Sequence, residues 1–271
     1  MKQYILGIEL GSTRIKSVLT DENAAVIAQG SYEWENELTD GLWSYPLELV
    51  EEGLRKSYAS LAESFVEKTG CELERISAIG ISAMMHGYLA FDCEDKLLVP
   101  FRTWRNTNTD RAANELSELF KYNIPMRWSV AHYYQAILNN EPHVSRVKHL
   151  NTLAGYVHFK LTGKRVLGIG DASGMFPVSN GGYDKDMLAS FNRVLEQKGV
   201  YSHFEELLPT VLTAGEDAGT LTREGAKWLD PTGKLKAGCL LCPPEGDAGT
   251  GMVATNSIMP CTQGHSSTRR R

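Results

Sequence analysis

The sequence predicts a mixed α/β fold, because short β-type segments and amphipathic helical segments alternate along the chain. Residues 4–10 and 14–20 are apolar and are joined by a glycine turn, which predicts a β-hairpin. Residues 46–68 then carry apolar side chains at helical spacing, which predicts an amphipathic helix packed on a sheet. With 271 residues, 42% of them hydrophobic, the chain can bury a substantial core.

The remaining elements follow in chain order. Gly70 and Gly163 suit the left-handed conformation that ends helices, so each is expected to end one. A β-rich run over residues 76–82 is expected to carry the segment Met84–Gly87 at its end. Residues 88–92 and 96–101 predict a second hairpin. Helical patterns cover residues 110–122, with Leu119 on the apolar face, and then 150–161, 187–197 and 224–229.

Composition excludes several classes of function. The net charge of −5 argues against a nucleic-acid surface, which is normally basic. The sequence contains no apolar run long enough to span a bilayer, and the N-terminus enters a strand pattern without the apolar stretch of a signal peptide. We therefore expect a cytoplasmic protein.

The cysteines do not form a disulfide framework, because they are odd in number and scattered. They are Cys71, Cys93, Cys239, Cys242 and Cys261. Cys239 and Cys242 have the spacing of a redox or metal site, but the residues between them are apolar and no second pair completes a zinc site. We interpret the segment as a buried strand.

The most informative segment is a carboxylate, Asp247, on a glycine-rich turn just after an apolar strand. A second glycine turn lies at Gly11–Thr13, and Met84–Gly87 lies between the two. Together with further segments in the same order and at the same spacing, they resemble the N-terminal half of the FGGY carbohydrate kinases, with a xylulokinase-like pattern. The segments are Gly7–Thr13, Gly80–Gly87, Trp104–Thr107, Lys160–Gly163, Asp171–Gly174, Leu208–Pro209, Gly219–Thr222 and Gly246–Gly249.

The resemblance implies the ribonuclease-H-like fold of the actin, sugar kinase and Hsp70 ATPase superfamily, in which ATP and sugar meet in a cleft. It implies ATP-dependent phosphorylation of a ketose such as xylulose, or of a related pentulose or sugar alcohol, with ATP and Mg²⁺ as cofactors. Residues 1–246 would form the sugar-binding domain, and residues 247–271 would begin a second domain.

Asp247 matches the catalytic aspartate of the family, which takes the proton of the attacking hydroxyl. A carboxylate on a glycine-lined turn is well placed for that role. The structural alternative is an N-cap, since Asp is a favoured first residue and the following residues have a helical pattern. Both roles are compatible.

Glu9 stands where the family usually has an aspartate that organises hydrated Mg²⁺, and a water-mediated contact can absorb the extra methylene. The alternative is a solvent-facing strand residue. Gly11, Ser12 and Thr13 match a phosphate-binding turn, because glycine allows close backbone approach and the hydroxyls donate. Arg14 would add positive charge there.

The predicted sugar contacts come from two segments. They are Met85, His86, Gly87, Trp104, Arg105 and Asn106. A neutral imidazole can exchange hydrogen bonds with hydroxyls, and Met85 offers an apolar wall. A structural histidine and a core tryptophan are the alternatives. Arg105 and Asn106 depart from the Asn-Asp of many relatives, so the sugar can differ from xylulose.

Three further segments remain open. Asp171 and Ser173 either line the cleft or serve a turn. Gly168 and Gly170 have the spacing of part of a dinucleotide-binding motif. We discount this interpretation because the strand-glycine-helix context of that motif is missing. The match ends near Asn256, and a polar basic tail follows.

Because relatives continue well beyond this length, we expect a truncated or frame-shifted product, or half of a split kinase whose partner is a separate C-terminal domain chain. A non-catalytic sugar-binding module is the main alternative. An NAD-linked sugar oxidoreductase is disfavoured, because no dinucleotide fingerprint is present.

Overall fold

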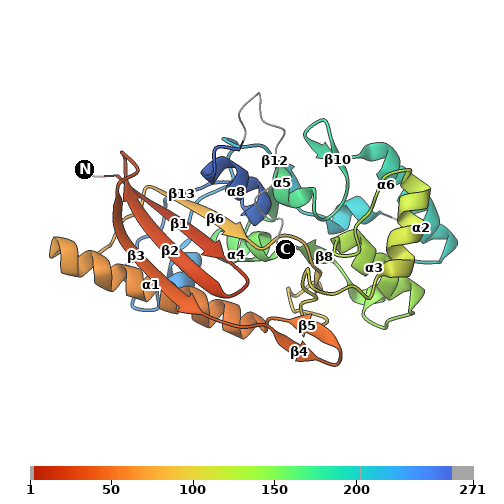
Figure 1. The fold of residues 1–271 in the computed structure, drawn as a ribbon, viewed down its shortest axis with the longest axis horizontal. Helices are drawn as coiled ribbons and strands as arrows, with labels where there is room; N and C mark the ends of the chain where they lie inside the picture. Colours follow the sequence, from red (N-terminus) through yellow and green to blue (C-terminus); the bar gives the residue numbers. More distant parts are fainter. Residues whose placement is uncertain (1–2, 202, 258–271) are drawn as a thin grey trace.

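The computed structural model describes residues 3–201 and 203–257 (Figure 1). The basic tail at 258–271, with Cys261, lies outside the described residues, as does most of the expected second domain. No helix in the described part of the chain is long and apolar enough to cross a membrane.

The central sheet has six strands. These are β1 (Tyr4–Leu10), β2 (Arg14–Asp21), β3 (Val26–Glu33), β6 (Ala78–Ala83), β13 (Leu240–Leu241) and β14 (Glu245–Gly246). The order is β13-β6-β1-β2-β3, and β14 also pairs with β6. The predicted β1–β2 hairpin is confirmed as antiparallel, whereas β6 runs parallel to β1, with Glu9 opposite Ser82. The sheet therefore brings the ends of β1, β6 and β14 together at one edge.

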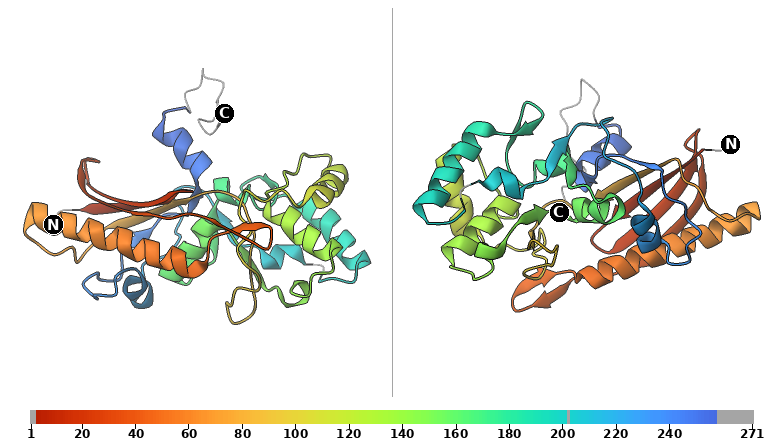
Figure 2. Two further views of the ribbon diagram at one scale, coloured as in Figure 1. Left: turned by 60° about the horizontal axis from the view of Figure 1, so that its bottom comes forward. Right: turned by 180° about the vertical axis from the view of Figure 1, so that it is seen from behind.

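Three of the helices in the described residues pack together on one face of this sheet. Alternate residues of β1, namely Leu6, Ile8 and Leu10, are buried, whereas Gly7 is exposed and Glu9 is only partly buried. Helix α1 (Leu47–Thr69) packs on β2 and β3, and α4 (Leu153–Thr162) and α7 (Arg223–Leu229) share its hydrophobic core. Figure 2 shows α1 on one side of the sheet and α8 (Asp247–Ala254) on the other. The second face of the sheet is thus open to a ligand.

A second hydrophobic cluster lies at the other end of the molecule (Figure 1). It is built by α2 (Asp110–Phe120), α3 (Ser129–Leu138) and α6 (Lys185–Gln197), around phenylalanine rings in contact with one another, including Phe176 and Phe191. The short elements are β4 (Glu37–Thr39), β5 (Leu42–Ser44), β7 (Leu89–Phe91), η1 (Val144–Arg146), β8 (His149–Asn151), β9 (Val166–Gly168), α5 (Ile169–Ala172), β10 (Val178–Ser179), β11 (Gly182–Tyr183), η2 (Phe204–Leu207) and β12 (Thr210–Leu212).

Most predicted elements form, with three corrections. Gly70 and Gly163 end α1 and α4 in the left-handed conformation, with φ of 71° and 75°. The turn of the predicted second hairpin forms, but the strand partner of β7 is β8, and its expected partner makes only isolated bridges. Leu119 is 39% exposed instead of facing the core. Cys239 is buried beside β13 as predicted, but Cys242 is exposed.

Helix α1 is held against β3 at a position where only glycine fits. A Cβ on Gly30 would lie 2.0 Å from the carbonyl oxygen of Ser57 and 2.5 Å from the amide nitrogen of Leu61, both in the backbone of α1. Beside this contact, the buried hydroxyls of Ser17 and Ser57 form a hydrogen bond of 2.8 Å. The helix therefore lies as close to the sheet as backbone contact allows.

We predict that Gly30→Ala lowers the free energy of unfolding by about 1 to 3 kcal/mol, because backbone atoms of α1 must move away from the sheet. Gly182→Ala is the matched control, since a Cβ there meets no atom within 4 Å. Urea midpoints of the three proteins measure the effect. Equal stability of Gly30→Ala and the control would contradict this account of helix packing.

Candidate active site

A groove of about 650 Å³ lies on the open face of the sheet. Its floor is formed by the exposed face of β1, β2 and β6, and its wall by residues before and within α8. The lining residues are Gly7, Ile8, Glu9, Lys16, Val18, Gly80, Ile81, Ser82, Ala214, Gly215, Cys242, Pro243, Glu245, Asp247, Thr250, Gly251 and Ala254. Two of the predicted site residues, Glu9 and Asp247, therefore lie in one groove.

Glu9 projects from β1 into this groove. Its side chain is 47% exposed, and Oε2 accepts a hydrogen bond of 3.1 Å from Nζ of Lys16. A pair this exposed contributes little to stability, because solvent screens the attraction. The Glu9 carboxylate is thus available to a ligand at small energetic cost, with a lysine beside it that can balance its charge.

The turn that joins β1 to β2 lies at the end of the groove and does not line it. The N–H of Gly11 donates to the carbonyl of Arg14 at 3.0 Å, which closes the turn. Two carbonyl groups of the turn accept hydrogen bonds from buried side chains. The indole of Trp34 donates to the Gly11 carbonyl and the hydroxyl of Tyr45 donates to the Ser12 carbonyl, each at 2.7 Å.

Two of the predicted phosphate-binding residues line a separate open hollow. Thr13 and Arg14 face it together with acidic residues, and Arg14 forms an exposed ion pair of 2.5 Å with Glu33. The positive charge expected from Arg14 is therefore shared with a carboxylate. A phosphate role for Gly11, Ser12, Thr13 and Arg14 stays a prediction.

Asp247 lies where the groove meets the Met85–Gly87 segment. It is the first residue of α8, directly after β14, and its Oδ1 accepts the N–H of Met85 at 3.2 Å. The N-cap of α8 is Gly246, which makes no side-chain cap, so the interpretation of Asp247 as the capping residue is wrong. A Cβ on Gly246 would lie 2.0 Å from Cγ of Met85. Only glycine there lets the two segments meet.

Burial raises the pKa of the Asp247 carboxyl. The N–H of Met85 lowers this pKa in part, and the charge of Glu9 raises it. A carboxyl that is partly withdrawn from water and has a raised pKa holds a proton more strongly than an exposed one does. The Asp247 carboxylate is therefore a stronger base than an exposed aspartate.

His86 is held in a strained and enclosed conformation. Its φ is 70°, in the left-handed region that a non-glycine residue occupies at a cost of about 1 to 3 kcal/mol. The ring packs on the backbone of Gly174, where a Cβ would lie 2.6 Å from Nδ1, and Nδ1 has no hydrogen-bond partner among protein groups. Burial, and then the charge of Arg127, lower the pKa of His86 to about 4. The imidazole is neutral at physiological pH.

Gly87 fixes the other side of His86. Its φ is 101°, and a Cβ there would lie 2.6 Å from the carbonyl oxygen of Arg102. Its N–H donates to the carbonyl of Arg127 at 3.0 Å, and its carbonyl accepts from the Ser129 hydroxyl at 2.6 Å. The backbone on both sides of His86 is therefore bound.

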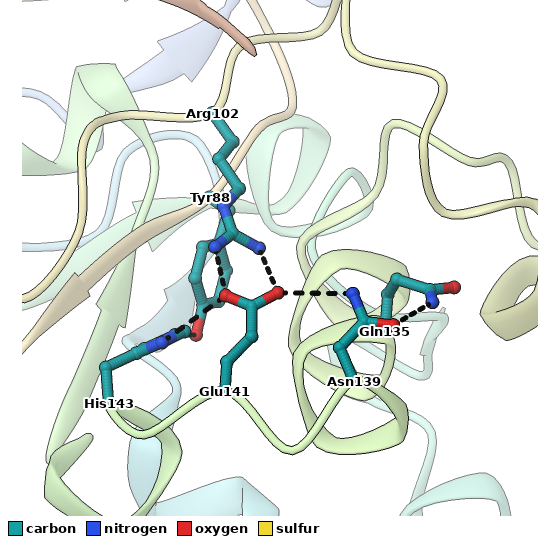
Figure 3. Close-up of polar contacts among 6 residues, drawn as sticks. All are labelled: Tyr88, Arg102, Gln135, Asn139, Glu141 and His143. Atoms are coloured by element: carbon teal, nitrogen blue, oxygen red, sulfur yellow. Dashed lines mark hydrogen bonds and ion pairs between the residues drawn. The ribbon is translucent and has the colours of Figure 1, made fainter. Parts of the chain in front are cut away.

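A largely buried polar network includes Tyr88, the residue that follows this segment (Figure 3). Arg102 and Glu141 form a bidentate ion pair, and the backbones of Arg102 and Tyr88 donate hydrogen bonds to each other. The hydroxyl of Tyr88 pairs with Nε2 of His143 at 2.9 Å, and Nδ1 of His143 lies 3.5 Å from Glu141. Sequence reasoning missed this network, whose members are far apart in the chain.

The predicted contacts at Trp104, Arg105 and Asn106 lie away from the groove. The Asn106 amide is buried and bonds both backbone groups of Trp43, at 2.9 and 2.8 Å. The Arg105 guanidinium lies over the Trp43 ring, 4.3 Å from its centroid, and Trp104 packs partly buried against the main core. Arg105 and Asn106 therefore contact Trp43 of β5, and the sugar roles of all three residues stay predictions.

Asp171 is buried close to Asp247. Its Oδ2 accepts from the Thr152 hydroxyl at 2.6 Å, and its Oδ1 has no partner among protein groups. Burial, and more weakly the charges of Glu245 and Asp247, raise the pKa of Asp171 to about 7, against the effect of the Thr152 hydrogen bond. The Ser173 hydroxyl donates to the Gly170 carbonyl at 2.6 Å, as expected for a turn residue.

Comparisons with known proteins all relate this chain to carbohydrate kinases. Residues 4–232 match the N-terminal domain of the FGGY family of carbohydrate kinases. A xylulose kinase of Lactococcus lactis is 24% identical over 252 residues, which are 86% of this chain and 46% of that protein. A glycerol kinase of Thermococcus gammatolerans is 22% identical over 241 residues, covering 81% and 48%.

The structure also resembles solved structures of carbohydrate kinases. A xyloylose kinase from Brucella ovis superimposes with a TM-score of 0.79 at 20% identity, covering 95% of this chain and 51% of that one. This likeness confirms the predicted fold, that of the actin, sugar kinase and Hsp70 ATPases. The chain spans about half the length of the curated relatives it matches.

We predict that His86 does not titrate between pH 5 and 8, because burial lowers its pKa from 6.5 to about 4. Between these two values the unfolded chain binds the proton more readily than the folded one. The stability that His86 contributes is therefore complete above pH 6.5 and is lost as the pH falls through about 4. An imidazole NMR titration measures this. A midpoint near 6.5 would contradict the burial of the ring.

Proposed function

Because the chain belongs to the FGGY family of carbohydrate kinases, matching its N-terminal domain over residues 4–232, we propose that it forms the sugar-binding wall of an ATP-dependent sugar kinase. Residues 1–246 would be this domain, and residues 247–271 would begin the next. The chain spans only 46% of the length of the Lactococcus lactis xylulose kinase, so the activity, the substrates and the site residues are all proposed here.

The observation that carries the proposal is the position of Asp247. Its carboxylate lines the groove of Glu9 and also accepts the N–H of Met85, the residue before His86. A nucleotide in the groove and a sugar at Met85 and His86 would therefore meet at this one carboxylate. Two substrates that meet beside a base can react without the entropic cost of a random encounter.

Asp247 would act as the general base. The sugar hydroxyl gives its proton to the carboxylate while its oxygen forms a bond to the γ-phosphorus of ATP. The bond from that phosphorus to the bridging oxygen breaks, and ADP leaves. A raised pKa suits this step, because the carboxylate must both accept the proton and release it afterwards.

The expected sugar is a ketose, such as xylulose or a related pentulose or sugar alcohol. The relatives named above are described as kinases of xylulose and glycerol. The neutral His86 ring can exchange hydrogen bonds with hydroxyls. Met85 would supply an apolar surface for the carbon face of the sugar.

The groove residues fit a nucleotide with Mg²⁺. Glu9 and Asp247 offer carboxylate oxygens, the ligand type that this ion prefers directly or through water. Bound there, Mg²⁺ would neutralise charge on the phosphates. Lys16 donates to Glu9 and would stand beside the same phosphates. We propose Glu9 as the metal-organising residue on this basis.

A non-catalytic sugar-binding role is the second candidate. It is favoured because the region that matches the family, residues 4–232, is its N-terminal domain, to which the proposed sugar contacts belong. If so, a ketose raises the melting temperature of the chain while Mg-ATP leaves it unchanged. A separate C-terminal domain chain would then be needed for turnover.

We predict that Asp247→Asn lowers kcat by at least ~100-fold, in a chain that turns over alone or after addition of the C-terminal domain of a relative. The amide keeps the hydrogen bond to Met85 but cannot accept the proton. Sugar affinity should change little, because the geometry of the segment is preserved. Unchanged turnover would remove Asp247 from the mechanism.

We predict that His86→Ala weakens ketose binding by about 1 to 3 kcal/mol, because hydroxyls of the sugar lose a partner. Isothermal titration measures the affinity. The melting temperature without ligand is the control, and an unchanged affinity together with a large loss of stability would identify a purely structural histidine.

A further inference from the structure

The carboxylate of Glu245, two residues before Asp247, is bound by a turn from a distant part of the chain. Its Oε2 accepts the N–H of Asp171 at 3.0 Å, and its Oε1 accepts the N–H of Gly170 at 3.4 Å. The N–H of Gly168 donates to the carbonyl of Pro244 at 2.8 Å. Residues 244 and 245 are thus attached to residues 168–171, Pro244 through its carbonyl and Glu245 through its side chain.

The two glycines of this turn leave the space that the carboxylate occupies. A Cβ on Gly168 would lie 2.1 Å from Oε1 of Glu245, and a Cβ on Gly170 would lie 2.6 Å from Oε2. Neither glycine has a positive φ, so close approach and not backbone conformation explains both. The Gly168–Gly170 pattern, which resembles part of a dinucleotide motif, therefore serves a carboxylate of the same chain.

Opposite this turn, the same strand touches β6 and Met85. Glu245 and Gly246 pair with Ser82 and Ala83 in parallel register. Residues 245–247 thus contact the 168–171 turn on one side and the end of β6 on the other. Helix α8 has no buried residue of its own, and the hydrogen bond of 2.8 Å between the hydroxyls of Ser82 and Thr250 is a further contact between it and β6.

From this geometry we infer that Glu245 is a positioning residue, whose carboxylate, docked on the Gly168–Asp171 turn, holds Asp247 against the N–H of Met85. The inference rests on the proposed function only in that it makes Asp247 the base; the docking itself does not depend on catalysis. Without the docked carboxylate, residues 244–247 keep the two-residue pairing with β6 and the backbone hydrogen bond from Gly168 to Pro244. They lose the side-chain contact nearest to Asp247, so the Asp247 carboxylate can move away from Met85.

Amide hydrogen exchange of the 271-residue chain tests this, because the Met85 N–H has Asp247 as its partner. In Glu245→Ala we expect exchange at Gly170, Asp171 and Met85 to become at least ~10-fold faster. Glu245→Gln, which retains one acceptor oxygen, should give a smaller effect. The neighbouring Met84 N–H is the internal control, since it donates to Leu10 of β1 at 2.9 Å and should stay protected.

Gly170→Ala tests the same contact from the other side, because the new Cβ displaces the carboxylate while Glu245 remains. It should reproduce the Met85 effect. Glu224→Ala, at an exposed position of α7, is the matched control and should change none of these amides. A ¹³C titration of the Asp247 carboxyl adds a readout that loss of stability alone does not move. Its pKa should fall toward the ordinary aspartate value in Glu245→Ala and Gly170→Ala, as the carboxyl becomes exposed.

Two results would overturn the inference. Faster exchange at Gly170 and Asp171 with unchanged Met85 exchange and Asp247 pKa would mean that Glu245 anchors the turn without positioning Asp247. Unchanged exchange at Gly170 and Asp171 would mean that the carboxylate is not docked. Failure of the proposed function is a separate result, seen as full turnover of Asp247→Asn while the exchange coupling persists.

Discussion

The site depends on the short pairing of β14 with β6. Only Glu245 and Gly246 take part, opposite Ser82 and Ala83. This pairing nevertheless joins segments that lie 162 residues apart, because it places Asp247 beside the N–H of Met85. Parallel strands end at the same edge of a sheet, so β1, β6 and β14 all deliver their following residues to one place. The groove and the His86 segment meet only there.

The rest of the architecture leaves that place accessible. Helices α1, α4 and α7 share one face of the sheet, and the backbone contact at Gly30 holds α1 close to it. The opposite face carries Gly7, Glu9 and Gly80, small or polar residues that form the floor of the groove. A ligand can bind on the face of the sheet that α1, α4 and α7 do not cover. The polar network around Arg102 and Glu141 holds the backbone of Tyr88, the residue that follows the Met85–Gly87 segment.

Much of the fold was predictable from periodicity, and the site only in part. The first hairpin and α1 have clear apolar patterns, and Gly70 marks the end of the helix. Helix α3 is buried on nearly every residue, so it has no amphipathic pattern to detect. Asp247 was predictable as a candidate because a carboxylate among glycines is a local signal and its segment resembles the FGGY kinases. The docking of Glu245 on residues 168–171 was not, because it is a contact between distant segments that leaves no pattern in either one.

The central claim, that a sugar at Met85 and His86 meets the groove at Asp247, is tested most directly by NMR contacts from a bound ketose. The account predicts intermolecular NOEs from the sugar to the Met85 methyl group and the His86 ring, with a shift of the Asp247 amide. Addition of Mg-ATP should then perturb Glu9 and Gly251 on the opposite side of the same carboxylate. NOEs confined to Val18 and Gly251, with Met85 and His86 unperturbed, would place the sugar in the groove itself and contradict the account.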